Sequence, residues 1–420
     1  MAREMKDSGI PWVGKIPNNW DVKRGKVILT LLERPIKPDD GVITCFRDGM
    51  VTLRSNRRED GFTISLQETG YQGVEPGDLV VHGMDGFAGA IGISDSRGKG
   101  TPVLNVLDSN QHKPFLMYYL RNMAYTGVFL SLATGIRVRS CDTNWNKLKS
   151  LLYSFPPLDD QKRIADYLNR KCAEIDAVLN KTRTSIEEYK KLKQAIITQA
   201  VTKGVRGDRS MKESGIEWVG RIPADWDVRR IKTLFSLRDE RNTLPLAEVN
   251  LISLYTDQGV VQHADLEKTT GNKASNADGY KKVYQNDIIV NIILCWMGAI
   301  GRSDFDGVTS PAYDVYIPTD KVESRFYHYY FRTTGFSGDC YKRGRGIMAM
   351  RWRTYSDQFR DIPVVFPPIG EQQVIVKRLD KMCSQVDTLI AKKEKVVSEL
   401  ESYKKSLIYE YVTGKKEVPA

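Results

Sequence analysis

The chain has 420 residues, 41% hydrophobic and 27% charged, a composition that is ordinary for a globular protein and excludes a disordered one. No apolar run reaches the roughly 18 residues of a membrane span, and we expect no secretory signal at the charged N-terminus. The cysteines and histidines are scattered, which favours neither disulfides nor a zinc site. We therefore expect a cytoplasmic protein. The 63 Lys and Arg against 52 Asp and Glu give a net charge of +11, which favours a polyanionic partner.

The sequence contains an internal duplication. Met5–Lys26 and Met211–Lys232 are identical at 15 of 22 positions, at an offset of 206. The repeat continues through three further matched blocks: Tyr71–Val81 with Tyr280–Val290, Gly89–Gly92 with Gly298–Gly301, and Phe155–Pro157 with Phe366–Pro368. Between these blocks, for example at 34–66 against 240–275, the halves look unrelated. A duplicated scaffold that carries two different variable surfaces is the expected architecture.

The first half, residues 1–155, is predicted to be a small α+β domain. Short apolar runs at Leu79–Val81 and Ala90–Ile93 indicate strands, and Lys113–Met123 has helical spacing. The second half, residues 205–366, should repeat this domain. Several aromatic residues are shared by both halves and are therefore expected in the core rather than at a variable surface: Trp12/Trp218, Trp20/Trp226, and Phe115, Tyr118 and Tyr119 with their counterparts Phe326, Tyr329 and Tyr330.

Each half is followed by a long predicted helix, at 156–204 and 367–416. Proline and acidic residues open the first helix, and no Pro or Gly follows until Gly204. Apolar residues recur at alternating steps of four and three in both helices, with polar interruptions at the same two steps, Thr182/Lys393 and Lys193/Lys404. This heptad seam predicts that the helices form an antiparallel coiled coil. Packing on the domains, or binding a partner protein, is the alternative use of the seam.

The sequence lacks the catalytic and nucleotide-binding motifs that are typical of an enzyme. No phosphate-binding G-x-x-x-x-G-K-[ST] loop is present, and Thr413–Lys416 lacks the leading glycine and the hydroxyl. The Phe-Pro-Pro segments lack the asparagine of an amino-methyltransferase loop, and Glu188–Lys190 matches a nuclease fragment without its upstream acids. We therefore expect that the chain catalyses no reaction by itself and binds no cofactor or metal.

Basic residues cluster in the stretches where the halves differ. Arginine can form a bidentate contact with guanine, asparagine with adenine, and lysine binds phosphates. A solvated surface charge is the alternative for each residue alone. The candidate DNA-binding residues are Arg54, Arg57, Arg58, Arg137, Arg139, Asn144 and Lys147 in the first half, and Lys273, Asn276, Lys281, Lys342, Arg343, Arg345, Arg351 and Arg353 in the second.

The order of these parts resembles the specificity subunit of type I restriction-modification systems. The resemblance covers essentially the whole chain. It is carried by the Ser-Gly-Ile-x-Trp-Val-Gly-x-Ile-Pro-x-x-Trp opening of each half, by the Phe-Pro-Pro-[Leu/Ile] that closes each half, and by helices that end in Val201-Thr202 and Val412–Lys415. The second junction keeps the Glu371-Gln372 of the family pattern, whereas the first has Asp160-Gln161, one carbon shorter.

The resemblance implies that residues 1–155 and 205–366 are target recognition domains, each reading half of a split, asymmetric DNA sequence. The helices 156–204 and 367–416 would be conserved regions that set the gap between half-sites and dock two methyltransferase subunits. S-adenosylmethionine would belong to those subunits, which methylate a flipped-out adenine, and ATP and Mg to restriction subunits that join in defence against phage. The rivals are a self-contained methyltransferase or nuclease with diverged motifs, and a coiled-coil scaffold that binds only proteins.

Overall fold

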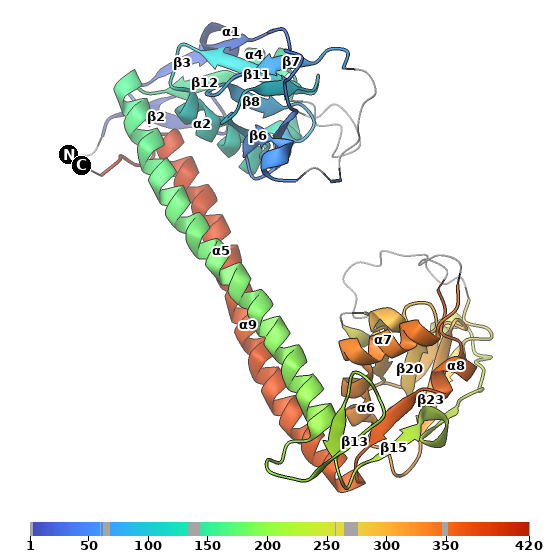
Figure 1. The fold of residues 1–420 in the computed structure, drawn as a ribbon. Helices are drawn as coiled ribbons and strands as arrows, with labels where there is room; N and C mark the ends of the chain where they lie inside the picture. The colour runs from blue at the N-terminus through green and yellow to red at the C-terminus, as the bar shows by residue number, and fades with distance from the viewer. Residues whose placement is uncertain are drawn as a thin grey trace. The chain divides into compact units, whose positions relative to one another are not determined.

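The computed structural model describes residues 3–58, 60–61, 68–132, 143–256, 258–263, 276–346 and 352–419. The chain divides into two compact units. Unit 1 joins Met1–Arg183 with Glu394–Ala420, and unit 2 is Thr184–Lys393. Each of the long helices α5 (Leu158–Lys203) and α9 (Ile369–Val412) contributes one segment to each unit (Figure 1). No helix in the described ranges has the length and apolar character needed to cross a membrane.

Unit 1 is built on a four-stranded antiparallel sheet with the order β4-β11-β8-β9. Its strands are β4 (Leu29–Leu31), β11 (Leu104–Ser109), β8 (Leu79–His82) and β9 (Ile91–Ile93). Helix α2 (Lys113–Tyr125) packs against this sheet through a nearly continuous buried face. The remaining elements are β1 (Met5–Asp7), β2 (Lys15–Pro17), β3 (Asp21–Arg24), α1 (Gly25–Ile28), β5 (Ile43–Cys45), β6 (Val51–Leu53), η1 (Arg54–Asn56), β7 (Gln72–Val74), η2 (Gly86–Ala88), β10 (Gly98–Gly100), α3 (Val128–Ser131), α4 (Trp145–Ser150) and β12 (Leu152–Phe155).

Unit 2 repeats this sheet strand for strand, with the order β16-β23-β20-β21. These strands are β16 (Phe235–Leu237), β23 (Tyr313–Pro318), β20 (Ile288–Asn291) and β21 (Ile300–Arg302). Helix α6 (Ser324–Phe331) takes the place of α2 and is followed by α7 (Thr334–Arg343). The remaining elements are β13 (Met211–Glu213), β14 (Arg221–Pro223), β15 (Asp227–Arg230), η4 (Ile231–Thr233), η5 (Leu246–Glu248), β17 (Ile252–Tyr255), β18 (Gly259–Gln262), β19 (Lys281–Val283), η7 (Cys295–Met297), β22 (Gly307–Thr309), α8 (Ser356–Arg360) and β24 (Pro363–Phe366).

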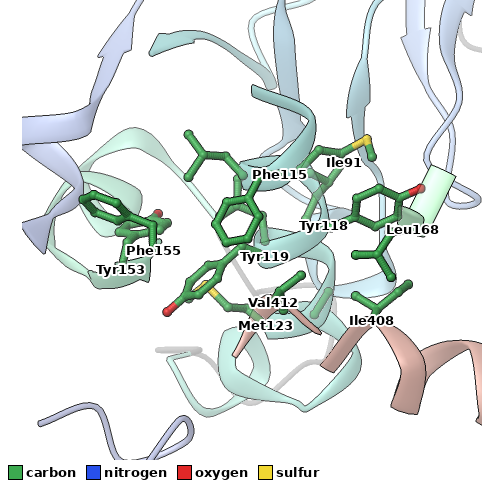
Figure 2. Close-up of a cluster of buried hydrophobic side chains, with 14 of the residues drawn as sticks. Ile91, Phe115, Tyr118, Tyr119, Met123, Tyr153, Phe155, Leu168, Ile408 and Val412 are labelled. Atoms are coloured by element: carbon green, nitrogen blue, oxygen red, sulfur yellow. The ribbon is translucent and has the colours of Figure 1, made fainter. Parts of the chain in front are cut away.

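The core of unit 1 joins the sheet to both long helices. Phe115 and Tyr119 of α2 are fully buried, and they share one cluster with Leu168 of α5 and with Ile408 and Val412 of α9 (Figure 2). The C-terminal turns of α9 are therefore part of the first domain's core, although more than 200 residues separate them from it in sequence. Because these contacts bury apolar area, they hold the end of the chain to its first half.

The core of unit 2 is the counterpart of this arrangement. Phe326 and Tyr330 of α6 are fully buried with Val201, at the end of α5, and with Ile375 and Leu379, near the start of α9. Trp20 and Trp226 are also buried, at 1% and 0% exposure. The expectation that the shared aromatic residues form cores is confirmed for Trp20, Trp226, Phe115, Tyr118, Tyr119, Phe326 and Tyr330. Trp12, Trp218 and Tyr329 are only partly buried and pack against these cores.

The two long helices pair antiparallel within each unit. In unit 1 the rings of Tyr167 and Tyr411 lie 4.7 Å apart, and the ammonium of Lys404 lies 2.6 Å from the carboxylate of Asp176. In unit 2 Lys193 forms the equivalent ion pair with Asp387 at 2.7 Å. The two polar interruptions at 193 and 404 are thus partners of aspartates on the facing helix, and they fix one register of the seam.

The predicted fold class is confirmed: two similar α+β domains arise from an internal duplication and are accompanied by two long antiparallel helices. The sequence placed the strands at Leu79–Val81 and Ala90–Ile93 within one residue of β8 and β9.

Candidate nucleic-acid interface

In unit 2 the candidate residues gather where α7 ends. Thr333 caps the start of this helix by accepting a hydrogen bond from the backbone N–H of Phe336. The helix stops at Gly344, and the chain then forms a short backbone ladder. A side chain at Gly344 would place its Cβ 2.3 Å from the indole nitrogen of Trp352. Glycine at this position therefore allows the chain to turn sharply behind the helix and to return close to it.

The ladder pairs Arg345 with Arg353. The backbone N–H of Arg345 donates to the carbonyl of Arg353 at 2.8 Å, and the reverse bond is 2.9 Å long. Directly opposite residues of an antiparallel pair point to the same face, and like charges there are destabilising. No ion pair between either guanidinium and a carboxylate is seen within the described ranges. The ladder thus presents two cations side by side, an arrangement that a polyanion would stabilise.

Aromatic rings lie beside this arginine pair. Tyr341 is 48% exposed, and its ring stacks on that of Trp352 with centroids 4.9 Å apart. The ring of Trp296 also contacts that of Tyr341, with centroids 5.6 Å apart. Exposed aromatic side chains beside arginines are typical of surfaces that bind nucleic acids or proteins. Sequence reasoning did not single out Tyr341, because its neighbours Trp296 and Trp352 are remote in sequence.

Two other second-half candidates, Lys342 and Arg343, are the last two residues of α7, and their surroundings differ. Arg343 is exposed at the C-terminal end of the helix. Lys342 is exposed as well, but its ammonium pairs with Glu217 at 2.5 Å, and this hydrogen bond raises the pKa of Lys342. Asn276 is also exposed. Arg351 and Lys273 lie outside the described residues.

Lys281 does not fit a DNA-contacting role. Its side chain is buried, and its ammonium donates to the carboxylate of Asp314 at 2.8 Å inside the domain. Burial of a charged side chain requires such a partner, so this lysine is removed from the candidate surface. The sequence held a signal for this correction, since Lys281 falls inside the repeated block and is the counterpart of Gln72. Gln72 makes an internal hydrogen bond to the carbonyl of Leu104.

In unit 1 three candidate arginines follow β6. Arg57 pairs with Asp48 at 2.7 Å and lies over the ring of Phe46, 4.2 Å from its centroid. Burial raises the pKa of Asp48, but the hydrogen bonds from Arg57 and from the backbone N–H of Met50, together with the charges of Arg57 and Arg121, leave this pKa lowered. Arg54 donates from Nε to the hydroxyl of Thr44 at 3.0 Å, and Arg58 is exposed beside it. The three arginines thus lie close together in sequence at the end of β6, and Arg57 and Arg58 are exposed.

Two of the remaining first-half candidates, Asn144 and Lys147, have local structural roles. Asn144 caps α4 and accepts a hydrogen bond from the backbone N–H of Lys147 at 3.1 Å. Lys147 donates from its ammonium to the carbonyl of Leu132 at 3.0 Å. These contacts explain both residues without a ligand. Arg137 and Arg139 lie outside the described residues.

No group of three or more His, Cys, Asp or Glu side chains that could hold a metal occurs within the described residues.

Comparisons with known proteins agree with this architecture. Residues 223–399 match the family model of the type I restriction modification DNA specificity domain. The chain is 26% identical, over 96% of its own length and 95% of the relative's, to a putative type I restriction enzyme MjaX specificity subunit of Methanocaldococcus jannaschii. It is 22% identical, over 56% of each chain, to the EcoDI specificity subunit of Escherichia coli. The fold matches a chain from a study of complex assembly and conformational transition in a type I restriction-modification system, with a TM-score of 0.67 at 14% identity, over 96% of this chain and 99% of that one.

Proposed function

We propose that this chain is a specificity subunit of the type I restriction-modification kind and that it reads a bipartite, asymmetric DNA site in the cytoplasm. Each globular domain, 1–155 and 205–366, contacts one half-site. The subunit is non-catalytic and holds no cofactor. Methylation and cleavage belong to two docked methyltransferase subunits with S-adenosylmethionine, and to restriction subunits with ATP and Mg.

The arginine ladder of unit 2 is the observation that carries DNA binding. Arg345 and Arg353 are joined by two backbone hydrogen bonds, so their guanidiniums share one face. Arg343 adds a third cation at the end of α7. Such a group suits phosphates and guanine edges, both of which bind arginine in a bidentate way.

In unit 1 the arginines proposed to contact DNA have chemically different surroundings. Its arginines follow β6 in a 3-10 turn, whereas those of unit 2 follow a helix. Arg57 is held in place by Asp48 and by the ring of Phe46. Because the two scaffolds match strand for strand but these segments do not, we propose that the halves read different base sequences.

We propose that the paired helices are the spacer between the half-sites. Helices α5 and α9 contain 46 and 44 residues, which corresponds to about 65–70 Å of helix at 1.5 Å per residue. The Lys–Asp pairs at 193/387 and 404/176 hold their register in each unit. A paired helix is stiffer than a flexible linker and would keep a single gap length.

Arginine substitutions test the proposed interface. Alanine at Arg345 or Arg353 should weaken binding of the cognate duplex by about 1–3 kcal/mol where a base contact is lost, and reduce the salt dependence where a phosphate contact is lost. Binding would be measured for the complex with its methyltransferase subunits at several salt concentrations. Lys147→Ala, at a residue that bonds the protein's own backbone, is the control and should leave affinity nearly unchanged. Unchanged affinity in both arginine variants would contradict this interface.

A further inference from the structure

The duplication places the same two donors in both units, beside the first turn of each long helix. In unit 2 the indole N–H of Trp226 donates to Oε2 of Glu371 at 2.9 Å. Arg209 donates to both oxygens of this carboxylate, at 3.2 Å to Oε2 and in a shorter contact to Oε1. Glu371 is only 5% exposed. One buried carboxylate thus satisfies an indole and a guanidinium, and Asp225 pairs with the same Arg209 at 2.5 Å.

Unit 1 keeps the donors but not the carboxylate. Trp20 and Arg3 are the counterparts of Trp226 and Arg209 at the offset of 206. Asp160 stands at the position of Glu371 and is one methylene shorter, and Asn19 replaces the charged Asp225. Trp20 is 1% exposed, and its Nε1 has no hydrogen-bond partner within the described residues. A buried donor without a partner is destabilising, so an added acceptor at this indole would be favourable.

A further substitution draws Asp160 away from the indole. Arg163 occupies the position that corresponds to Val374 in unit 2. It pairs with Asp160 at 3.3 Å, one turn along α5. Arg3 meanwhile makes only a long contact to Asn19, at 3.4 Å, and an ion pair at 3.3 Å to Glu417, whose side chain is 70% exposed. Relative to unit 2, the site gains Arg163, and within the described residues none of its carboxylates, Asp160, Glu4 and Glu417, accepts a hydrogen bond from the indole.

These residues line a cavity of about 460 Å³ together with Lys416 and with the carboxylates of Glu4 and Glu417. This volume is within the range of small-ligand sites. We propose that the cavity at Trp20, Arg3 and Arg163 is a carboxylate-binding site, which takes from outside the chain the carboxylate that Glu371 supplies internally in unit 2. The ligand is a small organic acid or the acidic side chain of a bound protein. The inference rests on the duplication and not on the proposed DNA role.

The site is tested by following the indole N–H of Trp20 by NMR in the full-length chain. The chain has seven tryptophans, so ¹⁵N-tryptophan labelling gives few resonances, and Trp20→Phe identifies the one of interest. Acetate is titrated against chloride at matched ionic strength, and N-acetylglutamate N-methylamide is titrated in parallel. A saturable shift of the Trp20 resonance is expected with at least one probe. Tighter binding of acetate points to a free acid, and tighter binding of the blocked glutamate points to a protein side chain.

Variants that exchange the two sites provide matched controls. Asp160→Glu combined with Arg163→Val recreates the unit 2 set and should weaken the saturable shift by at least about tenfold, because the internal carboxylate then competes for the same donors. Glu371→Asp should make the Trp226 resonance respond to the same probes. Shifts of Trp20 that do not saturate with either probe, or that persist unchanged in the Asp160→Glu/Arg163→Val chain, would overturn the proposal.

Discussion

Single residues decide which basic side chains remain available to DNA. Lys281 and Arg345 look alike in sequence, yet Lys281 is buried against Asp314 and Arg345 is exposed in a backbone ladder. Composition predicted the basic character of the variable stretches. Composition could not predict that Lys281 is buried and Arg345 exposed, because their partners Asp314 and Arg353 lie beside them only in the folded chain. Alignment of the two halves was the stronger guide, since it places Lys281 in the shared scaffold.

Lys281 should act on stability and not on DNA binding. Lys281→Met leaves the carboxylate of Asp314 buried without its partner and should lower the free energy of unfolding by about 3 kcal/mol. Urea unfolding measures the effect. The double variant Lys281→Gln/Asp314→Asn recreates the Gln72 and Asn105 of unit 1 and should recover much of the loss. A normal stability together with weakened DNA binding in Lys281→Met would show that this lysine faces DNA.

His328 should make the chain sensitive to acid. Burial, reinforced by the positive charges of Arg332, Arg302 and Arg325, lowers the pKa of His328 to about 3. The unfolded chain binds this proton near pH 6.5, so between pH 6.5 and 3 the unfolded state holds more protons and stability falls as the pH falls. From pH 7.5 to pH 5 the loss amounts to at most about 2 kcal/mol.

A substitution at this histidine isolates its share of the acid sensitivity. His328→Gln keeps a side-chain acceptor for the backbone N–H of Arg302, which His328 binds at 3.2 Å. Urea unfolding at pH 7.5 and pH 5 should show a smaller stability difference in this variant than in the wild type. Equal differences in the two proteins would mean that His328 does not titrate in this range.

At the scale of elements, the sequence predicted the long helices better than the short strands. The heptad pattern runs through ten positions of each helix, so many residues indicate the same structure. It also predicted the two polar seam positions, but not that Lys193 and Lys404 each face an aspartate of the other helix. Most strands have only three or four residues, too few for a periodic pattern, and their pairing depends on contacts that are distant in sequence.

The proposed spacer can be lengthened without disturbing either unit. One heptad inserted between Arg183 and Thr184, and another between Lys393 and Glu394, fall at the boundaries of the units and keep the seam in phase. The added helix is about 10.5 Å long, which matches about three base pairs of B-DNA. Methylated sites in cells that express the variant should therefore show an unread gap longer by about this amount.

Insertion into one helix alone is the control for the spacer. It shifts α5 against α9 in one of the units and should break the Lys193–Asp387 or the Lys404–Asp176 pair. Methylation should then be lost. A gap of unchanged length in the double insertion would show that the helices do not determine the spacing.

For the whole molecule, the duplication gives the chain two separate scaffolds, which the proposed reading of two half-sites requires. Each unit contains a complete sheet and its own core, and each core includes the C-terminal end of one long helix and the start of the other. Changes in the variable segments of one unit therefore leave the other unit's scaffold intact. The sequence predicted this repeat from 15 identities in 22 positions. It did not predict that Asp160 leaves the indole of Trp20 without an acceptor, because one missing methylene matters only once the fold brings the two residues together.

An exchange of one recognition domain tests the central claim most directly. Residues 27–155 would be replaced by the equivalent segment of another type I specificity subunit, and the methylated adenines would be mapped across the genome of cells that also express the methyltransferase subunits. We predict that one half of the methylated sequence changes, while the other half and the gap stay as in the parent. A change in both halves, or in neither, would contradict the assignment of one half-site to each domain.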